Sequence, residues 1–179
     1  MPITRGITED PIILFEGQRS VPVGTYDTVR FYSFFQYVGV GWSLDPSLQA
    51  GTFGLELIKA TECANYSAGQ TYSFVMRHWQ EYNQTTGRHY ASMYTMDMER
   101  DTEYALMVNN TRGSETLVIS LKIVGGSSEE ELRALLEPMV RNYVPFSLPS
   151  FLLLAISTGG GVIVIDIRRR KKHQQKIKA

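Results

Sequence analysis

The feature that most restricts the fold of this chain is a run of 22 residues without a charged side chain, from Val144 to Ile165. A helix from Pro149 to Ile167 would be about 28 Å long at about 1.5 Å per residue, close to the thickness of a hydrocarbon core. Five consecutive cations follow it, and cations of this kind mark the cytoplasmic side of a span: Arg168, Arg169, Arg170, Lys171 and Lys172. We therefore expect one transmembrane helix in residues 145–167 of a cell-membrane protein, with a buried element of a soluble domain as the alternative.

The charges of the chain are divided around this run. The 179 residues contain 18 basic and 18 acidic side chains, but residues 1–165 hold 11 basic and 17 acidic ones, a net charge of −6. The formal net charge of zero argues against nucleic-acid binding through bulk positive charge. The tail, residues 168–179, is strongly basic, so we expect it in the cytoplasm, where it either only sets the topology or also binds anionic membrane lipid.

Small residues interrupt the predicted span at its middle. Ala155 and Gly159 are four residues apart, as are Ser157 and Gly161. Residues at this spacing share a helix face and allow a second helix to approach closely, so they favour a protein partner in the membrane. The alternative is that glycine is simply frequent in membrane helices.

Three N-glycosylation sequons precede the span, at Asn65, Asn83 and Asn109. They are consistent with an extracytoplasmic body, the orientation that the basic tail also predicts. The first ten residues contain no basic segment followed by an apolar core, so no signal peptide is visible. Either a leader has been removed, or the C-terminal helix directs membrane insertion.

Between the termini the side chains alternate with the period of strands. Val38, Val40 and Trp42 alternate with smaller residues, and Leu117–Val124 repeats the pattern. After a segment of residues 1–10, we expect an all-β, antiparallel sandwich in residues 11–125. The expected strands are Ile12–Glu16, Thr28–Phe35, Val38–Ser43, Phe53–Ile58, Tyr72–Trp79, His89–Met96, Glu103–Asn109 and Leu117–Val124.

A helix is expected to follow the sandwich. Ser128 and Glu131 form a capping box, and three consecutive carboxylates favour the positive end of a helix dipole. Pro138 is expected to break or kink the helix. Residues 126–144 are thus predicted to be a juxtamembrane helical spacer.

Several strings resemble GOLD-like sandwich domains, the fold of the lumenal domain of emp24/p24 cargo proteins and of small prokaryotic surface proteins. The strings are Phe15–Gly17, Val21–Tyr26, Leu55–Leu57, Cys63–Gly69, Glu103–Thr111 and Thr116–Val124. The resemblance covers residues 11–124 and implies a jelly-roll or GOLD-like sandwich with a membrane anchor. The single cysteine, the lack of a long coiled coil and the absence of a terminal dilysine signal favour an archaeal-type surface protein over a p24-like cargo adaptor.

Catalytic motifs are few. If Tyr72–Trp79 and His89–Met96 formed a hairpin, His78, Glu81 and His89 could approach one another as a zinc site of a metal-dependent hydrolase. No short ligand motif supports this geometry, and isolated histidines are more often structural. We therefore expect no metal, no cofactor and no enzymatic activity.

Aromatic side chains are abundant, and a strand can direct only every other residue into the core. Some tyrosines should therefore be exposed, where they suit contacts with proteins or sugars. The alternative is that they line the core. The sequence thus predicts a membrane-anchored binding or assembly module, an accessory subunit of a membrane complex, that uses exposed aromatics and its membrane helix.

Overall fold

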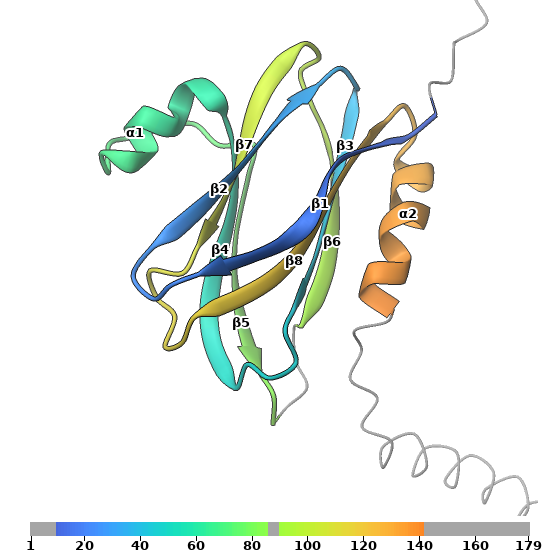
Figure 1. The fold of residues 1–179 in the computed structure, drawn as a ribbon. Helices are drawn as coiled ribbons and strands as arrows, with labels where there is room; N and C mark the ends of the chain where they lie inside the picture. The colour runs from blue at the N-terminus through green and yellow to red at the C-terminus, as the bar shows by residue number, and fades with distance from the viewer. Residues whose placement is uncertain (1–9, 86–89, 142–179) are drawn as a thin grey trace, which may run out of the picture. The chain divides into compact units, whose positions relative to one another are not determined.

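The computed structural model describes residues 10–85 and 90–141, which form a sandwich of two four-stranded antiparallel sheets (Figure 1). The first sheet has the order β1-β8-β3-β6, with strands Ile12–Val21, Leu117–Gly126, Tyr37–Leu44 and Ala91–Asp97. The second has the order β2-β7-β4-β5, with strands Tyr26–Ser33, Thr102–Asn109, Ala50–Lys59 and Met76–Asn83. Most consecutive strands lie in opposite sheets, and this is the order of a jelly roll.

The prediction of an all-β sandwich with eight strands is confirmed. Its core is made by alternate residues of the strands, as their period of two requires. In β3, Val38, Val40 and Trp42 face the core and are completely buried, while Gly39 and Gly41 face outward. The same alternation in β8 directs Leu117, Ile119, Leu121 and Ile123 into the core.

The fifth strand begins four residues later than expected, at Met76 rather than Tyr72. The chain between β4 and β5, residues 60–75, instead contains a short 3-10 helix, Ala60–Glu62, and helix α1, Cys63–Ser67. We call residues 60–75 the β4–β5 connection. It covers the outer face of the second sheet, where Cys63, Tyr66 and Tyr72 pack on a small buried cluster of Ile58, Ala105 and Met107.

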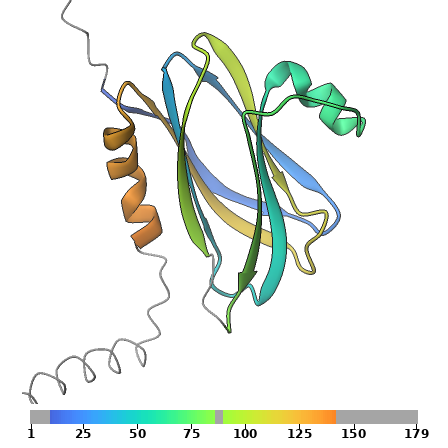
Figure 2. The ribbon, with the colours of Figure 1, turned by 180° about the vertical axis from the view of Figure 1, so that it is seen from behind.

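Helix α2, Glu129–Arg141, covers the outer face of the first sheet, on the side of the sandwich opposite α1 (Figure 2). Leu136 is completely buried, and a Cβ atom on Gly39 or Gly41 would lie within 2.9 Å of its methyl groups. The two glycines therefore allow the helix to lie close to the sheet. The predicted helix is thus confirmed, but it packs against the sandwich along its length.

Pro138 does not break this helix, so that alternative of the prediction, a break rather than a kink, is wrong. It lies in the last turn, and the helix continues to Arg141, whose guanidinium pairs with Glu137 at 2.6 Å. A proline this close to the end of a helix removes one backbone hydrogen bond but interrupts no later turns. The preceding turns pack on the sheet through Leu132 and Leu136.

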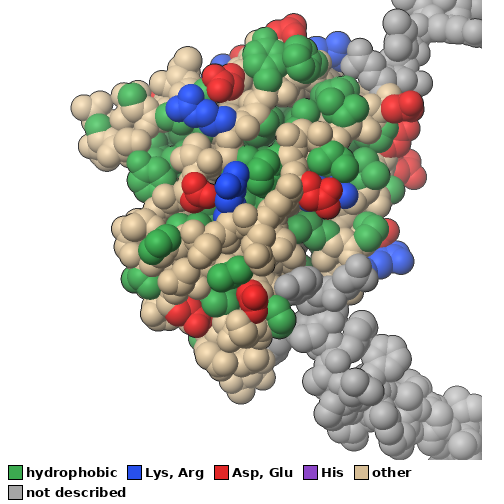
Figure 3. Space-filling model, in the orientation of Figure 1, with side chains coloured by type: hydrophobic (Ala, Val, Ile, Leu, Met, Phe, Trp, Pro, Cys, Tyr) green, Lys and Arg blue, Asp and Glu red, His purple; other side chains and the backbone are tan. Residues whose placement is uncertain are grey.

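Ion pairs join neighbouring strands on the surface. Arg19 of β1 pairs with Asp27 of β2 at 3.5 Å, and Lys122 of β8 pairs with Glu16 of β1 at 3.6 Å. On the face shown in Figure 3, acidic, basic and hydrophobic side chains lie among one another. This mixture is ordinary for a protein surface and does not mark a binding site on that face.

Candidate functional site

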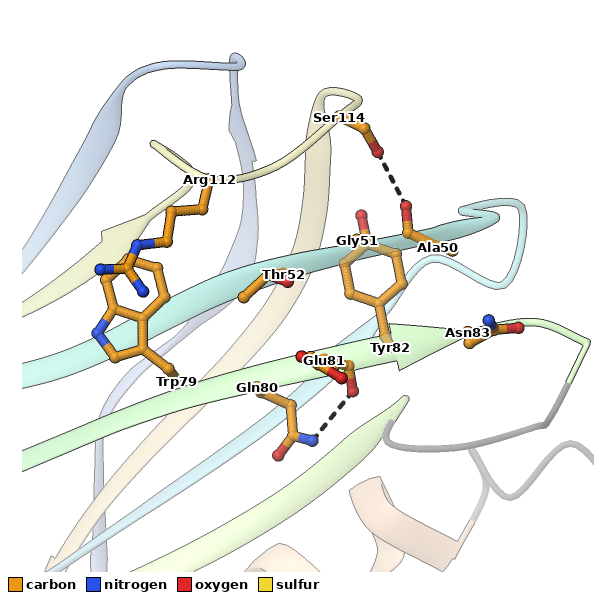
Figure 4. Close-up of a pocket in the computed structure, with 10 residues that line it drawn as sticks. All are labelled: Ala50, Gly51, Thr52, Trp79, Gln80, Glu81, Tyr82, Asn83, Arg112 and Ser114. Atoms are coloured by element: carbon orange, nitrogen blue, oxygen red, sulfur yellow. Dashed lines mark hydrogen bonds between the residues drawn. The ribbon is translucent and has the colours of Figure 1, made fainter.

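A shallow groove of about 830 Å³ lies on the second sheet, over the ends of β4 and β5 and beside the β7–β8 connection (Figure 4). Met76 and Tyr82 of β5 belong to the core, so the alternate residues of that strand face outward and contribute side chains to the groove. Ser114 closes one end, where its hydroxyl donates a hydrogen bond to the carbonyl of Ala50 at 2.9 Å. We call this the β4–β5 groove; its polar and aromatic side chains are Thr52, Trp79, Glu81, Asn83, Arg112 and Ser114.

Trp79 has a defined position in the groove. It pairs in register with Gly54 of β4, and a Cβ atom on Gly54 would lie 3.1 Å from the indole ring. The absence of a side chain at Gly54 therefore lets the indole lie flat on the sheet. From the β7–β8 connection, the guanidinium of Arg112 lies over the ring, 4.4 Å from its centroid. This cation–π contact restricts the orientation of both side chains.

The groove contains one acidic and one basic side chain that are not engaged in ion pairs. Within residues 10–85 and 90–141, neither Glu81 nor Arg112 forms a salt bridge. Both are exposed. Their hydrogen-bonding groups, five N–H donors of a guanidinium and two carboxylate oxygens, are thus available to a ligand.

Tyr82 forms the floor next to the groove. Tyr82 is buried beneath Gly51, and its hydroxyl lies 3.4 Å from Glu115 Oε1. The same Glu115 oxygen accepts a hydrogen bond from the backbone N–H of Gln49. Burial, and secondarily the Glu115 charge, raises the pKa of Tyr82 to about 12. Tyr82 therefore stays protonated and fixes the β4–β5 pair on which the groove is built.

A polar network holds the β4–β5 connection on the sheet beside the groove. Glu56 of β4 is 3% exposed, and one of its oxygens accepts hydrogen bonds from the Tyr72 hydroxyl at 2.6 Å and from Arg77 Nε at 2.8 Å. Arg77 also lies over the Phe74 ring, 4.2 Å from its centroid. Burial and the bond to Glu56 raise the pKa of Tyr72, and the same carboxylate raises the pKa of Arg77. Because both donors satisfy the buried carboxylate, this network is structural.

The three sequon asparagines occupy different environments. Asn109 is 9% exposed, its amide nitrogen donates to the Tyr66 hydroxyl at 2.7 Å, and its Oδ1 accepts from the hydroxyl of Thr111, the third residue of its own sequon. A glycan there would break these bonds. Asn65 lies in α1, where its amide nitrogen donates to Glu62 at 3.0 Å. Asn83 lines the β4–β5 groove.

The metal-site hypothesis requires a hairpin of Tyr72–Trp79 and His89–Met96, and the prediction of that hairpin is wrong. β5 pairs with β4 and β6 pairs with β3, so the two strands belong to different sheets. His78 points toward β6, where its ring lies 5.1 Å from that of Tyr94 and its Nε2 lies 2.8 Å from Gln80 Oε1. Glu81 is an odd number of residues away and faces the groove on the other side of the strand. His89 lies outside the described residues, and among the described ones no cluster of metal-binding side chains is present.

Aromatic side chains are divided between core and surface, as expected. Trp42, Tyr82, Tyr90 and Tyr104 belong to the core, whereas Tyr26, Tyr32, Phe34 and Phe74 are between 39% and 56% exposed. Tyr32 and Phe34 contact each other at a ring distance of 4.7 Å, and Tyr32 pairs with Glu103 at the start of β7, whereas the groove lies near the end of that strand. Composition predicts this division, but only the structure shows which aromatics lie on each side.

The predicted membrane span lies outside the described residues, with its packing residues Ala155, Ser157, Gly159 and Gly161, and so does the basic tail from Arg168 to Lys172. Within the described residues, none of the helices combines the length and the hydrophobicity that a membrane crossing requires.

Sequence reasoning did not find the β4–β5 groove. Trp79 and Arg112 are separated by 32 residues and are brought together because β4 pairs with both β5 and β7. The one local signal was the turn-forming string Asn109–Gly113, which places Arg112 on a connection between strands.

Comparison with known proteins gives distant likenesses. Neither the protein-family profiles nor the curated proteins include a match to this chain. A solved CBM4 structure is 8% identical, covers 69% of this chain and 81% of its own, and has a TM-score of 0.37. The Triatoma virus capsid is 7% identical over 66% of this chain and 87% of its own, with a TM-score of 0.42. A Bacillus endospore appendage is 10% identical over 72% of this chain and 100% of its own, with a TM-score of 0.31. Likenesses this weak carry no argument about function.

Proposed function

We propose that the protein is a single-pass membrane protein whose extracytoplasmic sandwich is a ligand-binding module, an accessory subunit of a membrane complex. The observation that carries this proposal is the β4–β5 groove, where a fixed indole lies beside a cation and an anion that have no ion-pair partner among the described residues. Trp79 and Glu81 project from β5, and Arg112 is held over the indole from the β7–β8 connection, so these side chains suit recognition of a ligand.

The membrane part of the proposal is supported by the sequence. An uncharged run between a body of net charge −6 and a basic tail is typical of a span with its cytoplasmic end at the tail. The small residues at Ala155 and Gly159 would contact helices of the complex, while the groove remains available to the ligand. The resemblance to GOLD-like surface proteins agrees with this arrangement.

Site-specific photo-crosslinking in native membranes tests the proposal. A photo-crosslinking amino acid replaces Thr52 in the groove, and the matched control carries it at Arg100, an exposed residue in the connection between β6 and β7. We expect a discrete adduct of higher mass from position 52 and none from position 100. Failure to form an adduct at position 52, or equal adducts at both positions, would refute the groove as a binding site.

A further inference from the structure

We infer that the protein forms a two-fold symmetric dimer in which β6 pairs antiparallel with β6 of a second copy. The inference goes beyond the proposed function and does not depend on the β4–β5 groove. It is drawn from three properties of β6: the unpaired backbone groups on its free edge, the apolar clusters that end at this edge, and a sequence that suits antiparallel pairing with itself.

β6 is an edge strand of the first sheet, and it lacks the usual protection of an edge (Figure 1). Charged side chains and bulges keep edge strands from pairing with other chains. β1 has a register shift between Ile13 and Phe15. β2 and β5 carry charged side chains within the strand: Asp27, Arg30, Arg77 and Glu81. β6 instead pairs regularly with β3 from Ala91 to Asp97, and its one charged residue is the last.

Alternate residues of β6 direct their backbone groups away from β3. Just before the strand, the carbonyl of Tyr90 accepts a hydrogen bond from the N–H of Leu44, and just after it the N–H of Met98 donates to β3's side of the sheet, at Gln36. Hydrogen-bonded residues alternate in an antiparallel pair, so the even-numbered residues of β6 bond to β3 and the odd-numbered ones face the free edge. Across residues 10–85 and 90–141, the backbone groups of these odd-numbered residues have no hydrogen-bond partner: Ala91, Met93, Thr95 and Asp97.

Apolar clusters on both faces of the first sheet are incompletely covered at this edge. On the inner face, Tyr94 and Met96 pack against the core but are only half-buried, whereas Val40, which pairs with Tyr94, is completely buried. On the outer face, Met93 and Leu135 pack on the cluster under α2 and are also half-buried. A strand added to β6 would cover both clusters, because its side chains alternate between the same two faces.

A second copy of β6 fits this edge. Antiparallel pairing that engages all the odd-numbered residues of both copies places Tyr94 opposite Tyr94 of the second copy, on the two-fold axis. Each odd-numbered residue then exchanges an N–H and a carbonyl across the interface, which gives about eight backbone hydrogen bonds. In this register Asp97 lies opposite Ala91, so no like charges meet.

The symmetry agrees with the proposed membrane anchor. A two-fold axis that relates two antiparallel edge strands is perpendicular to the sheet, so both copies of α2 cover the same face of the joined sheet. Arg141, the last residue of the helix, therefore lies on the same side of the dimer in both copies. A dimer anchored in one membrane requires this arrangement.

Disulfide cross-linking of the full-length protein in native membranes tests the inference. Tyr94→Cys is combined with Cys63→Ser, which removes the one cysteine of the chain. Tyr94 would lie in a non-hydrogen-bonded pair, whose Cα atoms are about 4.5 Å apart, a distance that a disulfide spans. We expect mild oxidation to give a covalent dimer of twice the chain mass. Tyr32→Cys in the same background makes the matched change at an exposed position of the edge strand β2 and should stay monomeric.

Proline variants separate pairing from folding. Thr95→Pro, added to Tyr94→Cys, removes an N–H that faces the second copy but none that bonds to β3. Two interface hydrogen bonds are then lost per dimer, so cross-linking should slow about tenfold or more. Thr28→Pro makes the same change on β2 and should leave cross-linking unchanged. Circular dichroism checks that each variant folds; if Thr95→Pro does not, Thr95→Lys places a charge at the same position and should also slow cross-linking.

Two results would overturn the inference. One is that Tyr94→Cys gives no covalent dimer; the other is that Tyr94→Cys and Tyr32→Cys cross-link equally, since the copies would then meet at random or through another contact such as a membrane helix. A cross-linked species whose mass is not twice that of the chain would show that β6 accepts a strand of a different protein, and the second copy would be wrong. None of these results involves position 52, so the groove and the dimer stand or fail separately.

Discussion

Gly113→Ala is expected to destabilise the sandwich through a clash with one buried side chain. A Cβ atom on Gly113 would lie 1.8 Å from Oδ1 of Asn110. Asn110 is completely buried, and its amide nitrogen donates to the carbonyls of Val21 at 2.8 Å and Glu115 at 2.9 Å. These bonds connect the β7–β8 connection to the end of β1. Because no space remains for both atoms, the amide must rotate away and both bonds are lost.

The expected cost follows from those bonds. Each hydrogen bond contributes about 1 kcal/mol net, and a buried carbonyl left without a donor adds about 1 kcal/mol, so the loss is about 3 kcal/mol. Gly113 has no left-handed φ, so alanine at this position would otherwise stabilise the fold by about 0.5 kcal/mol through the unfolded chain. The net effect is a destabilisation of about 2.5 kcal/mol, or roughly 10 °C in Tm.

A double-mutant cycle checks this reasoning. Asn110→Ala alone should cost about 3 kcal/mol, and adding Gly113→Ala should then stabilise the protein by about 0.5 kcal/mol, because the clashing oxygen is gone. Thermal unfolding of the full-length protein, followed by circular dichroism, gives the four stabilities. As a control, Gly69→Ala should cost about 1 kcal/mol in either background, because Gly69 has φ 66° and its penalty is local. If Gly113→Ala costs the same with and without Asn110, the clash is not the cause.

Three further outcomes are expected. Leu136→Ala, at the centre of the α2 contact, should cost about 3 kcal/mol in denaturant unfolding, whereas Leu135→Ala, which is partly exposed, should cost less than half of that. The pKa of Tyr82 is raised to about 12 in the folded protein, so its hydroxyl ionises at a lower pH in the unfolded state than in the folded state. Stability that is present below pH 10 should therefore fall between pH 10 and 12, and less steeply in Tyr82→Phe, as thermal melts across this range would show. Glycopeptide mass spectrometry of folded protein from a glycosylating host should find Asn109 bare; a glycan on it would contradict its buried hydrogen bonds.

Most of the fold could be predicted from local pattern, because alternation reports which side chains face a core. The strings around Val40 and Ile119 predicted β3 and β8 correctly. The pattern failed between Tyr72 and Val75, where aromatic residues suggested a strand. There Tyr72 turns its hydroxyl to the buried Glu56, and the chain crosses the outer face of the sheet before β5 begins. A tertiary hydrogen bond to a buried carboxylate leaves no periodic signal in the sequence.

The candidate site could not be predicted in the same way. Trp79 and Arg112 meet because of the strand order, which alternation does not specify. Gly39 and Gly41 are the small members of the alternating string around Val40, and in the structure they make room for Leu136 of α2. In both cases the decisive contact is made with a residue more than 30 positions away.

The strand order also determines when the protein can fold. β8 lies between β1 and β3, and β7 lies between β2 and β4, so the last two strands of the sandwich occupy inner positions of the sheets. The first two strands pair only with these two, and they have no partner until the final part of the sandwich has been synthesised. Such sequence-distant pairing makes folding slow, on the order of milliseconds to seconds. A nascent chain that ends before Leu117 leaves β1 unpaired, so the whole sandwich must emerge before its core can close.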